Sequence, residues 1–156
     1  ITEFLFDGRL PNEYNGGFSM NELLVDKEDN FYLFGHNLGL GYLRYFKFDV
    51  NGTVLSKNEK SEIFMPQRAF FNNKDEIVVA GQREGGGLTV YGAIYVFDKN
   101  MNIKSKRYYT EIPYHVFSSL TANSDGSYNI FLHYVQTYSY ENFNFVFLRT
   151  NTDGSI

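Results

Sequence analysis

The chain has 156 residues, a net charge of −4 and no cysteine. Its length suits one ordinary domain, and 43% hydrophobic with 21% charged residues is typical of a globular chain rather than a disordered one. Scattered lysines and arginines argue against a nucleic-acid surface, which needs a basic stripe. No apolar run of about 18 residues predicts a membrane span. The lack of cysteine excludes disulfides and thiolate metal sites.

Short apolar runs between turns rich in Gly, Asn and Asp predict strands throughout the chain. The 29 aromatic residues (13 Tyr and 16 Phe) also favour strands. No sustained helical period predicts a helix. In chain order, the expected strands are Ile1–Asp7, Glu22–Val25, Phe31–Gly35, Tyr42–Phe48, Thr53–Lys57, Arg68–Phe71, Ile77–Gly81, Ala93–Phe97, Ile103–Tyr108, Ser119–Ala122, Tyr128–His133 and Phe143–Leu148.

The strands recur in the same order with a period of about 45–50 residues, which is typical of propeller blades. The sequence therefore predicts an all-β fold of about three four-stranded antiparallel units, as β-propeller blades that form part of a larger propeller. The expected boundaries are 1–19 for the end of a preceding blade and its loop, 20–65 and 66–115 for two blades, and 116–156 for a blade lacking its last strand. An open multi-sheet sandwich, or blades completed by another copy of the chain, remain alternatives.

Phe48–Val54 contains the end of an apolar strand, then a turn with Asp and Gly, then a second strand that begins with Val. The same turn, followed by Ile, recurs in Thr152–Ile156. This pattern resembles bacterial β-propeller repeat proteins, especially secreted or lipid-anchored ones of the Bacteroidetes type. The middle unit departs from it, because Met101 stands where the pattern has Gly. The resemblance implies a location in the cell envelope (periplasm or outer-membrane surface) or outside the cell.

In propellers of this kind, ligands approach the face that bears the loops after each second strand. That geometry implies a ring of polar and aromatic side chains for a sugar or a peptide. The expected ligand-binding residues are His36, Gln82, Arg83, His133 and Tyr134. The simpler alternative is that each strand ends at water and takes a polar residue there.

The longest expected loop is rich in tyrosine, and such a loop is suited to contact with a protein. The residues expected in that contact are Tyr138, Tyr140 and Phe143. The turns that begin at Asp49, Asp98 and Asn151 carry alternate oxygen side chains as calcium loops do, but none has the bidentate Glu, so hairpin turns are expected. We expect no metal and no cofactor.

The sequence contains no nucleophile elbow and no cysteine, and its loop carboxylates occupy different positions in the repeat. We therefore expect a non-catalytic binding or scaffolding module of a larger cell-envelope or secreted protein. Its loop face would engage a protein partner or a glycan. The alternatives are a propeller-fold glycoside hydrolase or lyase, and a purely structural module.

Overall fold

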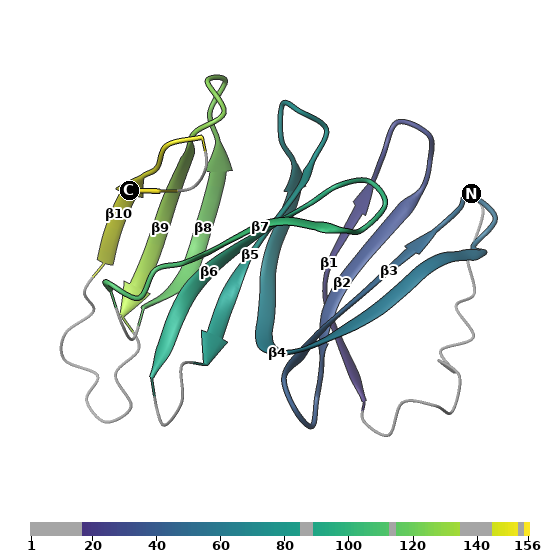
Figure 1. Ribbon diagram of the computed structural model, residues 1–156, viewed down its shortest axis with the longest axis horizontal. Coiled ribbons are helices and arrows are strands. Elements are labelled where there is room, and N and C mark those ends of the chain that lie inside the picture. The colour runs from purple at the N-terminus through teal and green to yellow at the C-terminus, as the bar shows by residue number, and fades with distance from the viewer. Residues whose placement is uncertain (1–16, 85–88, 113–114, 135–144, 153–154) are drawn as a thin grey trace.

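A computed structural model describes residues 17–84, 89–112, 115–134, 145–152 and 155–156, and every regular element within them is a β-strand (Figure 1). The expectation of an all-β chain is confirmed. No helix long and apolar enough to cross a membrane occurs in these residues. The strands are β1 (Phe18–Val25), β2 (Phe31–Asn37), β3 (Tyr42–Phe48), β4 (Val54–Phe71), β5 (Ile77–Glu84), β6 (Val90–Phe97), β7 (Ile103–Tyr108), β8 (His115–Ala122), β9 (Tyr128–Tyr134) and β10 (Phe145–Arg149).

The strands pair antiparallel with their neighbours in the chain, except that β7 and β8 lie in different sheets, and they form three layers. Sheet A contains β1, β2, β3 and the first half of β4; sheet B contains the second half of β4 with β5, β6 and β7. Sheet C has the order β10-β9-β8. Figure 1 shows the three layers side by side along the long axis of the molecule.

Strand β4 joins sheets A and B without a turn. Separate strands expected at Thr53–Lys57 and Arg68–Phe71 are therefore a wrong prediction, because the structure has one strand of 18 residues. The sequence between them contains no Gly and no Asn-Gly pair that would reverse the chain. Its proline, Pro66, lies where the β4–β5 register shifts, and a bulge is one of the few places where a sheet accepts proline.

Sheet B is buried on both faces. On β5, Ile77 and Val79 enter a core shared with sheet A, where they meet Tyr32, Phe34 and Tyr45. The alternate residues of β5 and β6 enter a second core, shared with sheet C. This follows from the period of two in a strand, which sends successive side chains to opposite faces. The residues of that second core are Val78, Ala80, Ile94, Tyr109, Phe117, Leu120, Tyr128, Ile130 and Leu132.

The same backbone hydrogen bond marks a five-residue turn at six places in the described residues. In each turn the first residue donates its N–H to the carbonyl of the fifth, beginning at Asp26, Asp49, Asn72, Asp98, Asn123 and Asn151. The fourth residue has φ between 57° and 86° in the five turns where it is described. Glycine adopts that conformation without strain, whereas Asp29, Asp75 and Met101 adopt it at some cost. At Met101 this cost is offset by burial of the side chain in the core between sheets A and B.

Two glycines allow the first strand of a sheet to approach the second closely. A Cβ on Gly35 would lie 2.1 Å from the carbonyl oxygen of Ser19, and a Cβ on Gly81 would lie 2.2 Å from that of Met65. The rings of Phe18 and Phe64 cover these glycines. Gly35 and Gly81 therefore permit close packing of the first strand against the second.

We predict that Gly81→Ala destabilises the fold by about 3 kcal/mol, because the new methyl group meets backbone that cannot move aside. The measurement is urea unfolding followed by circular dichroism. Gly39→Ala is the matched control: a Cβ there would meet only the side-chain oxygen of Asn37 at 3.4 Å. The control should change the free energy of unfolding by less than about 0.5 kcal/mol. Equal effects of the two substitutions would contradict this account.

Candidate functional site

The stack of sheets has two distinct ends. At the turn end, the β1–β2 and β4–β5 turns meet through Lys27 and Asp75, whose Nζ and Oδ1 atoms are 3.6 Å apart. The β4–β5 and β8–β9 turns meet where Asn73 Nδ2 donates to the carbonyl of Ser124 at 3.3 Å. Since β2, β5 and β9 all begin at this end, they all finish at the opposite one. That opposite end, with the connections after β2, β5 and β9, is called the loop end below.

Three of the predicted ligand-binding residues occupy one equivalent position at the loop end. His36 lies opposite Leu43, Gln82 opposite Gly92 and His133 opposite Phe145, each near the end of the second strand of its sheet. Each side chain bonds within its own sheet. No bond among the described residues joins one of the three to another, and burial lowers the pKa of His36 below its ordinary value.

Each first strand carries a β-bulge beside this position. The register shifts at Asn21 in β1, at Gln67 in β4 and at Ser118 in β8. In sheet A the bulge residue reaches its histidine, with Asn21 Oδ1 3.0 Å from His36 Nδ1. In sheet C, Ser118 Oγ lies 2.5 Å from the Nδ1 atom of His133. In sheets A and C the bulge thus aims a polar side chain at the residue that follows it by 15 positions.

Sheet B has the same register shift in its first strand, but Gln82 makes a different hydrogen bond. Gln82 donates from Nε2 to the sulfur of Met65 at 3.3 Å, and sulfur is a weak acceptor. The Oε1 atom of Gln67 is buried, and the structure gives it no hydrogen-bond partner among the described residues. Sequence reasoning missed the bulge residues altogether. The constant spacing of polar pairs (Asn21 with His36, Gln67 with Gln82, Ser118 with His133) is the signal that would have found them.

A second polar cluster lies around Glu62 of β4. Its carboxylate accepts hydrogen bonds from Tyr95 at 2.7 Å and from Tyr108 at 3.1 Å, and it also pairs with Lys106. The guanidinium of Arg83 lies 4.5 Å from the centre of the Tyr108 ring, within cation–π range. The structure thus brings one predicted residue, Arg83 of β5, against an aromatic ring of β7. Glu62 and Tyr108 were not predicted as site residues.

The surroundings of the Glu62 carboxylate favour its ionised form. Burial alone would raise the pKa of Glu62, but Lys106 and the two tyrosine hydroxyls outweigh it and lower the pKa to about 2. Burial, with Tyr108 and Glu62 as further causes, raises the pKa of Tyr95 above its ordinary range. The carboxylate therefore stays ionised and the phenol neutral. This arrangement anchors the crossing segment of β4 to β6 and β7.

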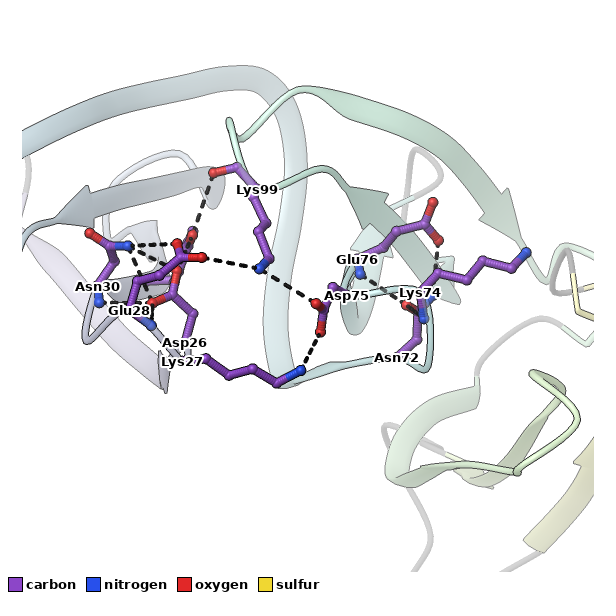
Figure 2. A network of polar contacts seen from close by, with 10 residues as sticks. Asp26, Lys27, Glu28, Asn30, Asn72, Lys74, Asp75, Glu76 and Lys99 are labelled. Atoms are coloured by element: carbon purple, nitrogen blue, oxygen red, sulfur yellow. Dashed lines mark hydrogen bonds and ion pairs between the residues drawn. The ribbon is translucent and has the colours of Figure 1, made fainter.

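The turn end carries a separate network, shown in Figure 2. Lys99 lies between two turns, with Nζ 4.0 Å from Glu28 Oε1 and 3.6 Å from Asp75 Oδ2. These side chains are exposed or nearly so, and such pairs each contribute about 0–1 kcal/mol. Asp26 is different because it is buried. Burial opposes its ionisation, but hydrogen bonds from Asn30, Tyr32 and the Glu28 N–H hold its pKa below its ordinary value.

The acidic turn residues bind their own backbone. Asp49 Oδ1 accepts from the N–H groups of Asn51 and Thr53 at 2.9 and 2.8 Å. Asp98 Oδ1 accepts from those of Asn100 and Asn102, both at 2.9 Å. These bonds are those expected of hairpin turns. Within the described residues, no group of three or more His, Asp or Glu side chains is placed to hold a metal ion.

Part of the predicted site lies outside the described residues. Tyr138, Tyr140 and Phe143, expected to contact a protein, belong to the undescribed segment 135–144. Tyr134 is described only as the last residue of β9.

Comparison with protein-family models finds none that matches this chain, and comparison with curated proteins finds no match either.

We predict that Glu62→Gln makes the free energy of unfolding less dependent on pH in the acid range. The folded-state pKa of Glu62 is lowered to about 2, so its contribution is complete above the ordinary value of 4.5 and is lost as pH falls toward 2. The side chain is 34% exposed, and we therefore reduce the contribution for solvent screening to about 1–2 kcal/mol. Urea unfolding at pH 7 and pH 2.5 measures it.

Between pH 7 and pH 2.5, the free energy of unfolding of the wild-type protein should fall by about 1–2 kcal/mol more than that of Glu62→Gln. The control is Glu111→Gln, which removes an exposed carboxylate that pairs with Arg107 on the surface. It should follow the wild-type dependence. If Glu62→Gln also follows the wild type, the anchoring role of the Glu62 carboxylate is wrong.

Proposed function

We propose that the three sheets are blades of a β-propeller, and that the chain is a non-catalytic binding or scaffolding module that engages a protein partner or a glycan through its loop end. The observation that carries this proposal is the equivalent placement of His36, Gln82 and His133 in three successive sheets. A bulged first strand supports each of them. Repetition of a polar position at one end of a stack gives a surface of several similar hydrogen-bonding groups, which suits a ligand with repeated hydroxyl or amide groups.

Aromatic groups at the loop end support the same proposal. Tyr91 and Tyr108 lie near Arg83, from which Tyr91 is directly across the β5–β6 ladder. Tyrosine rings offer an apolar face for a sugar ring or a peptide together with a polar hydroxyl. As part of this proposal, the parent protein is a secreted or envelope protein of the kind that the turn pattern of Phe48–Val54 resembles.

A binding role also agrees with the state of Glu62. General acid catalysis by a carboxylic acid needs a raised pKa, and glycoside hydrolysis needs a second carboxylate about 5–10 Å away. The pKa of Glu62 is lowered instead, and its oxygens are occupied by Tyr95, Tyr108 and Lys106. These groups fit a rigid support for Arg83, which lies over the Tyr108 ring, better than a reacting centre.

We predict that replacing His36, Gln82 and His133 together with alanine weakens ligand binding at least tenfold, because the repeated hydrogen-bonding groups are lost. Two probes are used: a panel of soluble plant and bacterial polysaccharides tested by affinity electrophoresis, and a phage-displayed peptide library. Circular dichroism checks that the variant folds. The comparison identifies whether the loop end takes a glycan or a peptide.

The matched control replaces three exposed residues of the turn end, Asn51, Lys74 and Ser124, with alanine. This control should bind as the wild type does. Unchanged binding by the loop-end variant would place the ligand elsewhere, and binding of neither probe by the wild type would overturn the proposal. Cleavage of a bound polysaccharide would show an enzyme instead.

A further inference from the structure

The turn between β3 and β4 carries an Asn-Gly pair at the turn end of the stack. It comprises residues 49–53, and Asn51 and Gly52 are both exposed. Gly52 has a φ of 81°. The sequence has a second Asn-Gly pair, Asn15-Gly16, outside the described residues. The pair at Asn51 is therefore the one whose surroundings the structure shows.

An Asn-Gly pair can modify itself. The deprotonated backbone nitrogen of the glycine attacks Cγ of the asparagine side chain, a C–N bond forms and ammonia leaves. Water then opens the cyclic imide at either of its two carbonyls, which gives aspartate or isoaspartate. The net change is hydrolysis of the side-chain amide, and water is the only other reactant. Glycine favours the attack, because it has no side chain to hinder the approach and its backbone is the most mobile.

Asp49 restrains both reacting residues in the folded turn. The N–H of Gly52, which carries the attacking nitrogen, donates to the carbonyl of Asp49 at 3.0 Å. Asp49 Oδ1 accepts from the N–H groups of Asn51 and Thr53 at 2.9 and 2.8 Å, which fixes the backbone on both sides of the reacting bond. These donors, Thr53 first, hold the pKa of Asp49 below its ordinary value. The acceptor is therefore ionised at the neutral and alkaline pH that favours the reaction.

The β6–β7 turn has the same hydrogen bonds but a different fourth residue. Asp98 Oδ1 accepts from the N–H groups of Asn100 and Asn102, and Met101 donates to the carbonyl of Asp98 at 3.0 Å. Asn100 is exposed, as Asn51 is. The next nitrogen belongs to Met101, whose side chain is buried in the core between sheets A and B. That nitrogen reaches Cγ of Asn100 only if the core moves, so Asn100 is an internal reference for Asn51.

We propose that Asn51 is a site of spontaneous deamidation, and that Asp49 controls the rate in the folded protein through the hydrogen bonds of the turn. The reaction then requires local opening of the turn, which releases the nitrogen of Gly52. The site lies at the turn end. It does not depend on the proposed ligand-binding role of the loop end.

The two products change the turn in different ways. Aspartate at position 51 adds one negative charge close to the carboxylate of Asp49. Isoaspartate routes the main chain through the former side chain and so adds one atom to the backbone before Gly52. The turn is closed by the N–H of Asp49, which donates to the carbonyl of Thr53 at 3.0 Å, and the added atom lengthens that closed ring. The isoaspartate form should therefore unfold at a lower urea concentration than the unmodified chain.

The first experiment follows the reaction in the wild-type protein. Trypsin releases residues 48–57 as one peptide, in which Asn51 is the only asparagine. After incubation in mildly alkaline buffer, mass spectrometry of this peptide should show the exchange of NH₂ for OH, and Asn100 should be at least tenfold less modified. In urea, which removes the turn, deamidation of Asn51 should be at least tenfold faster. Equal modification of Asn51 and Asn100, or equal rates with and without urea, would overturn the proposal.

The second experiment tests the role of Asp49. Asp49→Ala removes the acceptor of two turn hydrogen bonds and should speed deamidation of Asn51 in native buffer at least fivefold. Asp49→Asn keeps a side-chain oxygen at this position and should react at nearly the wild-type rate. Asn72 shows that an asparagine can fill this role, because its Oδ1 accepts from the N–H groups of Lys74 and Glu76, both at 2.9 Å.

The matched control is Asp98→Ala, which removes the same two bonds from the β6–β7 turn. It should leave the rate at Asn51 at the wild-type value. In urea, the wild type and Asp49→Ala should react equally fast, since the turn is then absent. Circular dichroism in native buffer checks that each variant folds. A wild-type rate in Asp49→Ala in native buffer, or an equal acceleration in Asp98→Ala, would show that Asp49 does not control the reaction.

Discussion

The burial of both faces of sheet B is the constraint on which the rest of the structure depends. A strand that is buried on both sides must be apolar at successive positions, and β5 meets this requirement with Ile77, Val78, Val79 and Ala80, all fully buried. Polar residues are then confined to the ends of the strand. The candidate site is a consequence of this constraint, because Gln82 and Arg83 lie in β5 beyond the buried run.

The recurring turn keeps the layers in register at the opposite end. Its first residue bonds the backbone, and its fourth residue takes a left-handed conformation, so each of these turns has the same length. Met101 adopts this left-handed conformation although it is better suited to glycine, and its side chain is buried in the core between sheets A and B. The ion pairs of Lys99 and Lys27 across the turns add little by comparison, since exposed pairs are screened by water.

Most of the strands could be predicted from the sequence because alternation and turn residues are local properties. The continuity of β4 and the three bulges could not, since register depends on which strands pair. The same limit applies to the site. The repeat predicts that His36, Gln82 and His133 are equivalent, but the contacts of Asn21 and Ser118 require the bulge geometry. Glu62 escaped prediction because its partners, Tyr95 and Lys106, are distant in sequence.

Sheet B differs from sheets A and C in the hydrogen bonds of the repeated polar position, which is Gln82 in sheet B and a histidine in the other two. In sheets A and C, a bulge residue and a histidine bond each other and so use up hydrogen-bonding capacity. In sheet B, Gln82 bonds a sulfur, and Gln67 keeps a buried oxygen without a partner among the described residues. A buried polar atom in that state costs free energy. Sheet B is therefore the layer in which the repeated pair is least satisfied, and its next residue, Arg83, lies over the Tyr108 ring instead.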